Sequence, residues 1–170
     1  LECPACYERL GGPYQDRSGH DWADNALRFG LLSKVAALLA STESPLDWTP
    51  DVLHCNDWQT ALAPAYLRYR LKPACATVTT VHNLAFQGLF APSLLGALDL
   101  PPAAMAIDGV EFHGRISFLK AALQHGDRIT TVSPTYAREI CEAEHGFGLD
   151  GLLRYRRDRR DGDLVGILNG

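Results

Sequence analysis

The stretch that most constrains the fold is Ala76-Thr77-Val78-Thr79-Thr80-Val81, followed directly by His82-Asn83-Leu84-Ala85-Phe86-Gln87-Gly88. Its first half is rich in β-branched residues and predicts a buried parallel strand. The polar pair His82-Asn83 ends that strand, and ligands of open α/β sheets bind outside the carboxyl ends of the strands. Gly88 lets the backbone turn tightly or approach a ligand closely. The stretch therefore predicts a strand that delivers a candidate site to one edge of a sheet.

The segments around this strand alternate between helical and extended patterns. Helices are expected at residues 24–40, 58–70 (kinked at Pro64), 116–124 and from an N-cap at Ser133 to Ile140. Strands are expected at 51–54, 76–81, 128–132 and 164–168, with loops over the first twenty residues and irregular chain at 91–114. This alternation predicts an α/β fold, a Rossmann-like parallel sheet with flanking helices and right-handed crossovers.

Composition narrows the functional class. A chain of 170 residues with 46% hydrophobic residues is long enough for one domain with a sizeable core. A net charge of −4 gives no reason to expect a nucleic-acid partner, and no apolar run is long enough for a membrane span. We expect a cytoplasmic protein without a signal peptide, whose five cysteines stay reduced. The lone pair Cys3-x-x-Cys6 lacks further ligands, so no bound metal and no cofactor are expected.

Polar residues follow all four predicted strands: Asp57, His82-Asn83, Ser133 and Asn169. Because parallel strands share one carboxyl edge, these side chains are predicted to converge on one cleft. Each has a simpler alternative, since Asp57 and Ser133 could cap helices, Asn169 could occupy a turn, and His82 could be a core histidine. The basic run at 154–160 is expected to be a solvated helix end rather than a site for an anionic partner.

Several longer motifs resemble bacterial glycogen synthases and plant starch synthases. They comprise His54–Pro64, Thr80–Gly88, Glu111–Gly114, Ser117–Ala121, Thr131–Ile140, Gly148–Leu153 and Leu168–Gly170, with shorter matches at Gly12–Tyr14 and Asp24–Phe29. The resemblance implies a retaining GT-B glycosyltransferase of two Rossmann-like domains that moves glucose from ADP-glucose to an α-1,4-glucan without a metal. Residues 1–170 are then expected to be part of the amino-terminal catalytic domain, inactive alone, with a missing amino-terminal start and the entire carboxyl-terminal domain absent.

The resemblance also implies roles for individual residues. His82 and Asp57 correspond to catalytic residues around the transferred glucose, and the substrate-binding residues correspond to Tyr14, Asn83, Gln87, Gly88 and Asn169. Two alternatives stay open: another retaining GT-B glycosyltransferase, or a non-catalytic sugar- or nucleotide-binding fragment. The choice between ADP- and UDP-glucose and the oligomeric state are also open.

Overall fold

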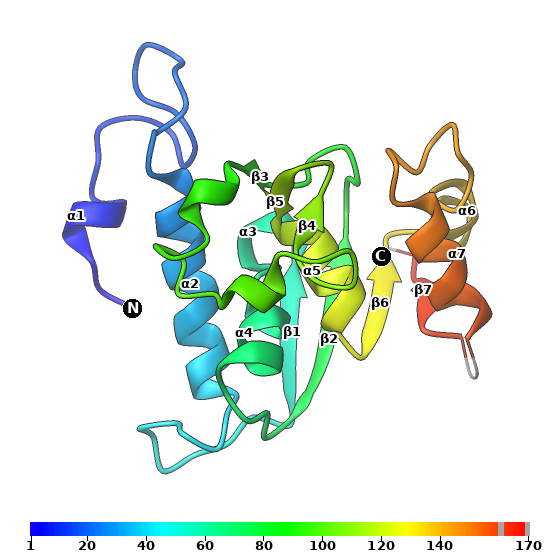
Figure 1. The fold of residues 1–170 in the computed structure, drawn as a ribbon, viewed down its shortest axis with the longest axis horizontal. Coiled ribbons are helices and arrows are strands. Elements are labelled where there is room, and N and C mark those ends of the chain that lie inside the picture. Colours follow the sequence, from blue (N-terminus) through cyan, green and yellow to red (C-terminus); the bar gives the residue numbers. More distant parts are fainter. Residues whose placement is uncertain (160–161, 169–170) are drawn as a thin grey trace.

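The four strands that the sequence predicts form one parallel sheet (Figure 1). The computed structural model describes residues 1–159 and 162–168. The sheet has the order β1 (Val52–Asn56), β2 (Ala76–Val81), β6 (Arg128–Thr131), β7 (Leu164–Gly166), and every neighbouring pair is parallel. The predicted α/β class is therefore confirmed, and the strand at 76–81 has the predicted bounds.

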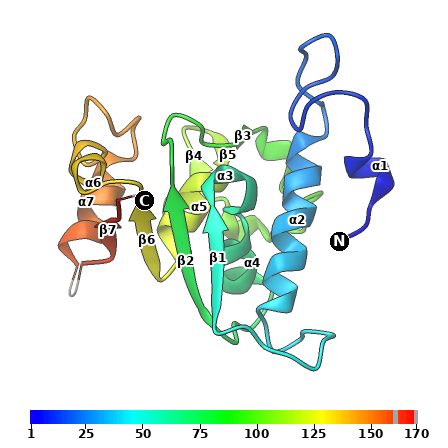
Figure 2. The ribbon, with the colours of Figure 1, turned by 180° about the vertical axis from the view of Figure 1, so that it is seen from behind.

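The helices of the crossovers pack on one face of this sheet. The chain between β1 and β2 forms α3 (Asp57–Thr60) and α4 (Ala63–Tyr69), and α5 (Phe118–His125) precedes β6. Each successive strand joins the same edge of the growing sheet, so right-handed crossovers place these helices on one face of it. On that face α4 contacts α5. The long α2 (Asn25–Leu39) packs outside α3 and α4. Figure 1 views the sheet from the helical side, whereas Figure 2 shows β1 and β2 in front.

Within the described residues, the opposite face of the sheet carries a polar row and no helical layer. His54 Nε2 lies 2.6 Å from Thr80 Oγ1, which lies 2.7 Å from Thr130 Oγ1. Val52 on the same side is 49% exposed, and β1 forms the edge of the sheet among the described residues. Parallel sheets are usually covered on both faces, so this face and edge are the least complete part of the fold.

Two predicted elements, the first strand and the helix that follows it, need correction. The first strand extends to Asn56 instead of ending at His54, so Asp57 follows it directly. The single helix expected at 58–70 is divided into α3 and α4, with Ala61 and Leu62 between them. Pro64 lies in the first turn of α4, where its missing N–H has no partner to lose, so it begins a helix rather than kinking one.

The region predicted to be irregular, 91–114, contributes one strand to a small antiparallel sheet. β5 (Arg115–Ser117) lies between β3 (Leu89–Phe90) and β4 (Glu111–Phe112), and two 3-10 helices, η1 (Pro92–Leu94) and η2 (Pro102–Ala104), precede β4. The helix expected from residue 116 therefore begins only at Phe118. Ser117 ends β5 and caps α5, because its Oγ accepts the Lys120 N–H at 3.1 Å.

The chain ends bring further differences. The first twenty residues include one helical turn, α1 (Pro4–Tyr7). The predicted cap of α6 (Pro134–Glu139) is confirmed, because Ser133 Oγ accepts the Tyr136 N–H at 2.9 Å. The third strand ends at Thr131 and the last at Gly166, both earlier than predicted.

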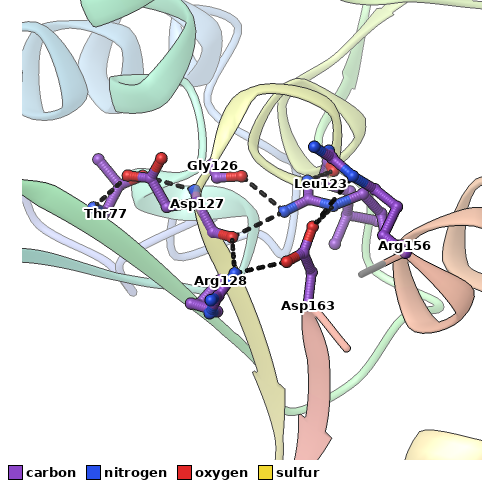
Figure 3. A network of polar contacts seen from close by, with 8 residues as sticks. Thr77, Leu123, Gly126, Asp127, Arg128, Arg156 and Asp163 are labelled. Carbon is purple, nitrogen blue, oxygen red and sulfur yellow. Dashed lines mark hydrogen bonds and ion pairs between the residues drawn. The ribbon is translucent and has the colours of Figure 1, made fainter. Parts of the chain in front are cut away.

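A buried ion pair joins α7 (Asp150–Asp158), whose last turn lies in the basic run, to the sheet (Figure 3). Arg156 is 2% exposed, and its Nε donates to Asp163 Oδ2 at 3.1 Å. The rest of its guanidinium donates to the carbonyls of Leu123, Gly126 and Asp127 at the end of α5. The interpretation of the basic run as solvated is therefore wrong for Arg156, whose helical position directs it inward, while Arg154, Arg157 and Arg159 are largely exposed.

His125, at the end of α5, should make the stability of the chain sensitive to acid. Burial is the main cause that lowers its pKa to about 4, below the ordinary value of 6.5. Between these two values the unfolded chain binds a proton that the folded chain does not, so stability falls as the pH drops. Lowering the pH from 7 to 5 should cost about 2 kcal/mol from this group. Urea unfolding of His125→Gln should lack that loss, and His20→Gln, at an exposed position, should retain it.

Candidate active site

Asp57 and His82 lie side by side at the carboxyl edge of the sheet. Asp57 opens α3 immediately after β1, and His82 follows β2, which pairs with β1 in parallel. Asp57 Oδ1 accepts the backbone N–H of His82 at 2.8 Å, and Asp57 Oδ2 lies 3.0 Å from His82 Nδ1. The His82 side chain is 45% exposed, which excludes the core-histidine alternative.

The backbone of Asp57 explains how the carboxylate reaches the neighbouring strand. Its φ angle is +50°, in the left-handed region that non-glycine residues seldom adopt and that recurs at functional sites. The N-cap of α3 is Asn56, and its side chain makes no capping bond. The helix-cap alternative for Asp57 is therefore wrong, because its carboxylate binds the backbone and imidazole of His82 instead.

The loop after His82 is held in a defined shape. Asn83 Oδ1 accepts the Ala85 N–H at 3.0 Å, which closes a turn through the side chain. Gly88 has a φ of +59°, and a Cβ atom there would lie 2.5 Å from Cε3 of Trp58. Only glycine fits this position without displacing the indole, so Gly88 sets how closely the loop approaches α3.

Gln87 offers a buried hydrogen-bond acceptor. The residue is 7% exposed, and its Nε2 donates to the carbonyl of Phe147 at 3.0 Å. Its Oε1 is buried and has no protein partner in the part of the chain that the structure describes. A buried acceptor without a partner is costly, so this oxygen is suited to receive a hydrogen bond from a ligand hydroxyl or a water molecule.

A pocket of about 670 Å³ joins most of the predicted site residues. Five of them contribute to its wall: Tyr14, Asp57, Asn83, Gln87 and Gly88. His82 is not part of this wall and contacts it through Asp57. Ser133 caps α6, and Asn169 lies outside the described residues.

The pocket also contains residues that the sequence did not single out. Its remaining lining residues are Gln15, Asp21, Asn25, Trp58, Gln59, Ala85, Phe86, Leu89 and Phe90. Gln59 Nε2 donates to the Tyr14 hydroxyl at 2.6 Å, and Asn25 Nδ2 donates to the Tyr14 carbonyl at 2.9 Å. Trp58 and Gln59 could have been found from the sequence, because they follow Asp57 directly. For Asn25 the only signal was its place in the shorter motif at Asp24–Phe29.

The chemistry of this lining suits a neutral polar ligand. It combines amide, hydroxyl and carboxylate groups with aromatic rings and contains neither Lys nor Arg. No group of three or more His, Cys, Asp or Glu side chains in the described residues could hold a metal ion. Burial raises the pKa of the nearby Cys55 thiol to about 12, so Cys55 is a packing residue and not a nucleophile.

Fold and pocket together define an α/β protein whose candidate ligand site lies at the carboxyl edge of a parallel sheet. The chain belongs to the starch synthase catalytic domain family, whose family model matches residues 1–155. It is 58% identical over 170 residues to the glycogen synthases of Dechloromonas aromatica and Aromatoleum aromaticum. Each match covers the whole of this chain and 34% of the length of the curated relative.

A solved structure agrees with the sequence relationship. The catalytic domain of starch synthase IV from Arabidopsis thaliana, bound to ADP and acarbose, superposes with a TM-score of 0.76 at 30% identity. The similarity covers 93% of this chain and 32% of that one. Among the described residues, no helix combines the length and the apolar character needed to cross a membrane.

Proposed function

We propose that this chain is part of a glycogen (starch) synthase that transfers glucose from ADP-glucose to the non-reducing end of an α-1,4-glucan with retention of configuration. Family membership supports the reaction. The structural observation that supports it for this chain is the Asp57–His82 pair beside the pocket. The Arabidopsis relative was solved with ADP, the nucleotide that transfer from ADP-glucose would release.

In this proposal His82 and Asp57 are the catalytic residues. Positive charge develops on the glucosyl ring as the bond to the nucleotide breaks, so groups that hydrogen-bond the sugar without adding charge favour the transition state. The imidazole of His82 donates to or accepts from a glucose hydroxyl, and the Asp57 carboxylate offsets the developing positive charge. Asp57 also fixes the backbone N–H of His82, so the two groups are held in place before the substrate binds.

The remaining predicted residues bind and orient the sugars. Gln87 Oε1 accepts a hydroxyl hydrogen, and Asn83 and Gly88 shape the loop. Tyr14 lines the pocket, and its hydroxyl accepts a hydrogen bond from Gln59. Asn169, which follows β7 in the sequence, is proposed to hydrogen-bond the same sugar.

We further propose that residues 1–170 form part of an amino-terminal catalytic domain. Two features support this: the chain spans about a third of its relatives, and β1, where Val52 is exposed, has no strand on its outer side in the described part of the chain. A neighbouring strand and a second helical layer would complete such a sheet. The proposed protein is cytoplasmic and uses no metal.

The direct test uses the full-length protein that contains this sequence. Incorporation of radiolabelled glucose into glycogen is measured with ADP-glucose and, in parallel, with UDP-glucose. Glucose added to chain ends from ADP-glucose supports the proposal. Transfer to a non-glucan acceptor would point to another GT-B glycosyltransferase, and binding of ADP without transfer would point to a non-catalytic module.

A further inference from the structure

The loop that carries His82 is held from both of its neighbours in the sheet. Because β2 lies between β1 and β6, the chain leaving β2 has another strand end on each side. On the β1 side, Asp57 binds the N–H of His82. On the β6 side, the hydroxyl of Tyr136 accepts the N–H of Leu84 at 2.8 Å. Two side chains therefore fix backbone groups two residues apart.

The position of Tyr136 is itself fixed by the start of α6. Ser133 Oγ accepts the Tyr136 N–H, and Pro134 begins the helix. The ring packs against the hydrophobic core, and burial is the largest cause that raises the pKa of the Tyr136 phenol. Ser133, predicted from the sequence to lie at the cleft, thus acts one step away by orienting Tyr136.

Leu84 links the hydrogen bond of Tyr136 to the position of His82. Its side chain is fully buried, so it anchors the loop in the core two residues after His82. Without the Tyr136 hydroxyl, the Leu84 N–H would lose its acceptor, and the segment from His82 to Leu84 would adjust to find another.

We propose that Tyr136 is a positioning residue that sets the orientation of the His82 imidazole from the side opposite Asp57. The inference rests on the proposed function, in which His82 contacts the transferred sugar. Small displacements of a catalytic group are expensive for turnover, whereas they change substrate affinity little. Tyr136→Phe removes only the hydroxyl oxygen and keeps the ring in the core.

The test is a double-mutant cycle in the full-length enzyme. Tyr136→Phe should lower kcat about 10-fold while the KM for ADP-glucose stays within about 2-fold. In the His82→Ala background the same change should alter kcat by less than about 2-fold, because the group that it positions is gone. Tyr155→Phe, at a position on α7 that is 60% exposed, is the matched control and should behave as wild type. An equal loss in both backgrounds would overturn the proposal while leaving the glucosyltransfer intact.

Hydrogen exchange provides a readout that does not depend on activity. In full-length Tyr136→Phe, amides of the segment 82–88 should exchange faster than in wild type, and amides of α7 should not change. If the full-length protein transfers no glucose, the proposed function fails, and this measurement still decides whether Tyr136 holds the loop. Unchanged exchange at 82–88 would contradict the positioning role in either case.

Discussion

Replacing Arg156 by methionine should lower the free energy of unfolding by about 3–5 kcal/mol, the range for breaking a buried ion pair. The change removes the buried cation that pairs with Asp163, a residue that is 4% exposed, and takes the Arg156 donors from the carbonyls of Leu123 and Gly126. Arg128 and Arg159, whose side chains are about half exposed, still contact Asp163, so the carboxylate is not left entirely unpaired. Urea unfolding of the two proteins at neutral pH measures the difference.

Two further variants distinguish the effect of breaking the buried ion pair from the effect of removing any positive charge. Arg157→Met removes a side chain that is 39% exposed and pairs only with the adjacent Asp158 among the described residues, so it should cost less than about 1 kcal/mol. Arg156→Met combined with Asp163→Leu should recover part of the stability, because a buried pair can be replaced by apolar groups. Equal costs for Arg156→Met and Arg157→Met would contradict the structural role of Arg156.

The comparison of Arg156 with the strand at 76–81 shows what the sequence can and cannot predict. The strand depends on a local run of β-branched residues and was predicted to the residue. The direction of Arg156 depends on α7 packing beside α5, a contact between segments far apart in the chain. The predictions at Pro64 and Ser117 were wrong for a related reason. A proline can kink a helix or begin one, and a serine can lie within a helix or cap it, and only the packed structure selects between these.

Some features of the candidate site can likewise be predicted from the sequence, and others depend on the packed structure. Parallel strands necessarily bring their carboxyl ends to one edge, so the proximity of Asp57 and His82 followed from the alternation of elements. The contribution of Asn25 and the clamp from Tyr136 could not be derived, because they depend on how α2 and α6 sit against the loops. No pattern in the sequence predicts that Asp57 adopts a left-handed backbone conformation, from which its carboxylate reaches His82.

His82→Ala in the full-length enzyme should reduce turnover about 100- to 1000-fold, which corresponds to about 2.7–4 kcal/mol of transition-state stabilisation. The imidazole is half exposed at the edge of the sheet and held by Asp57, so it is available to the sugar without being needed for packing. Contacts that strengthen as charge develops lower the barrier, whereas uniform contacts mainly set affinity. Binding of ADP, measured by calorimetry, should therefore change far less than turnover.

Asp57→Asn distinguishes a catalytic pair from a structural one. The amide oxygen can still accept the His82 N–H, but the negative charge beside the reacting sugar is lost, so turnover should fall by a similar factor while the thermal midpoint stays close to wild type. If His82→Ala instead retained near-normal turnover, the assignment of His82 would fail. If both variants lost activity together with a collapsed thermal midpoint, the contact would be structural, because a side chain that acts only on substrate contributes little to folding.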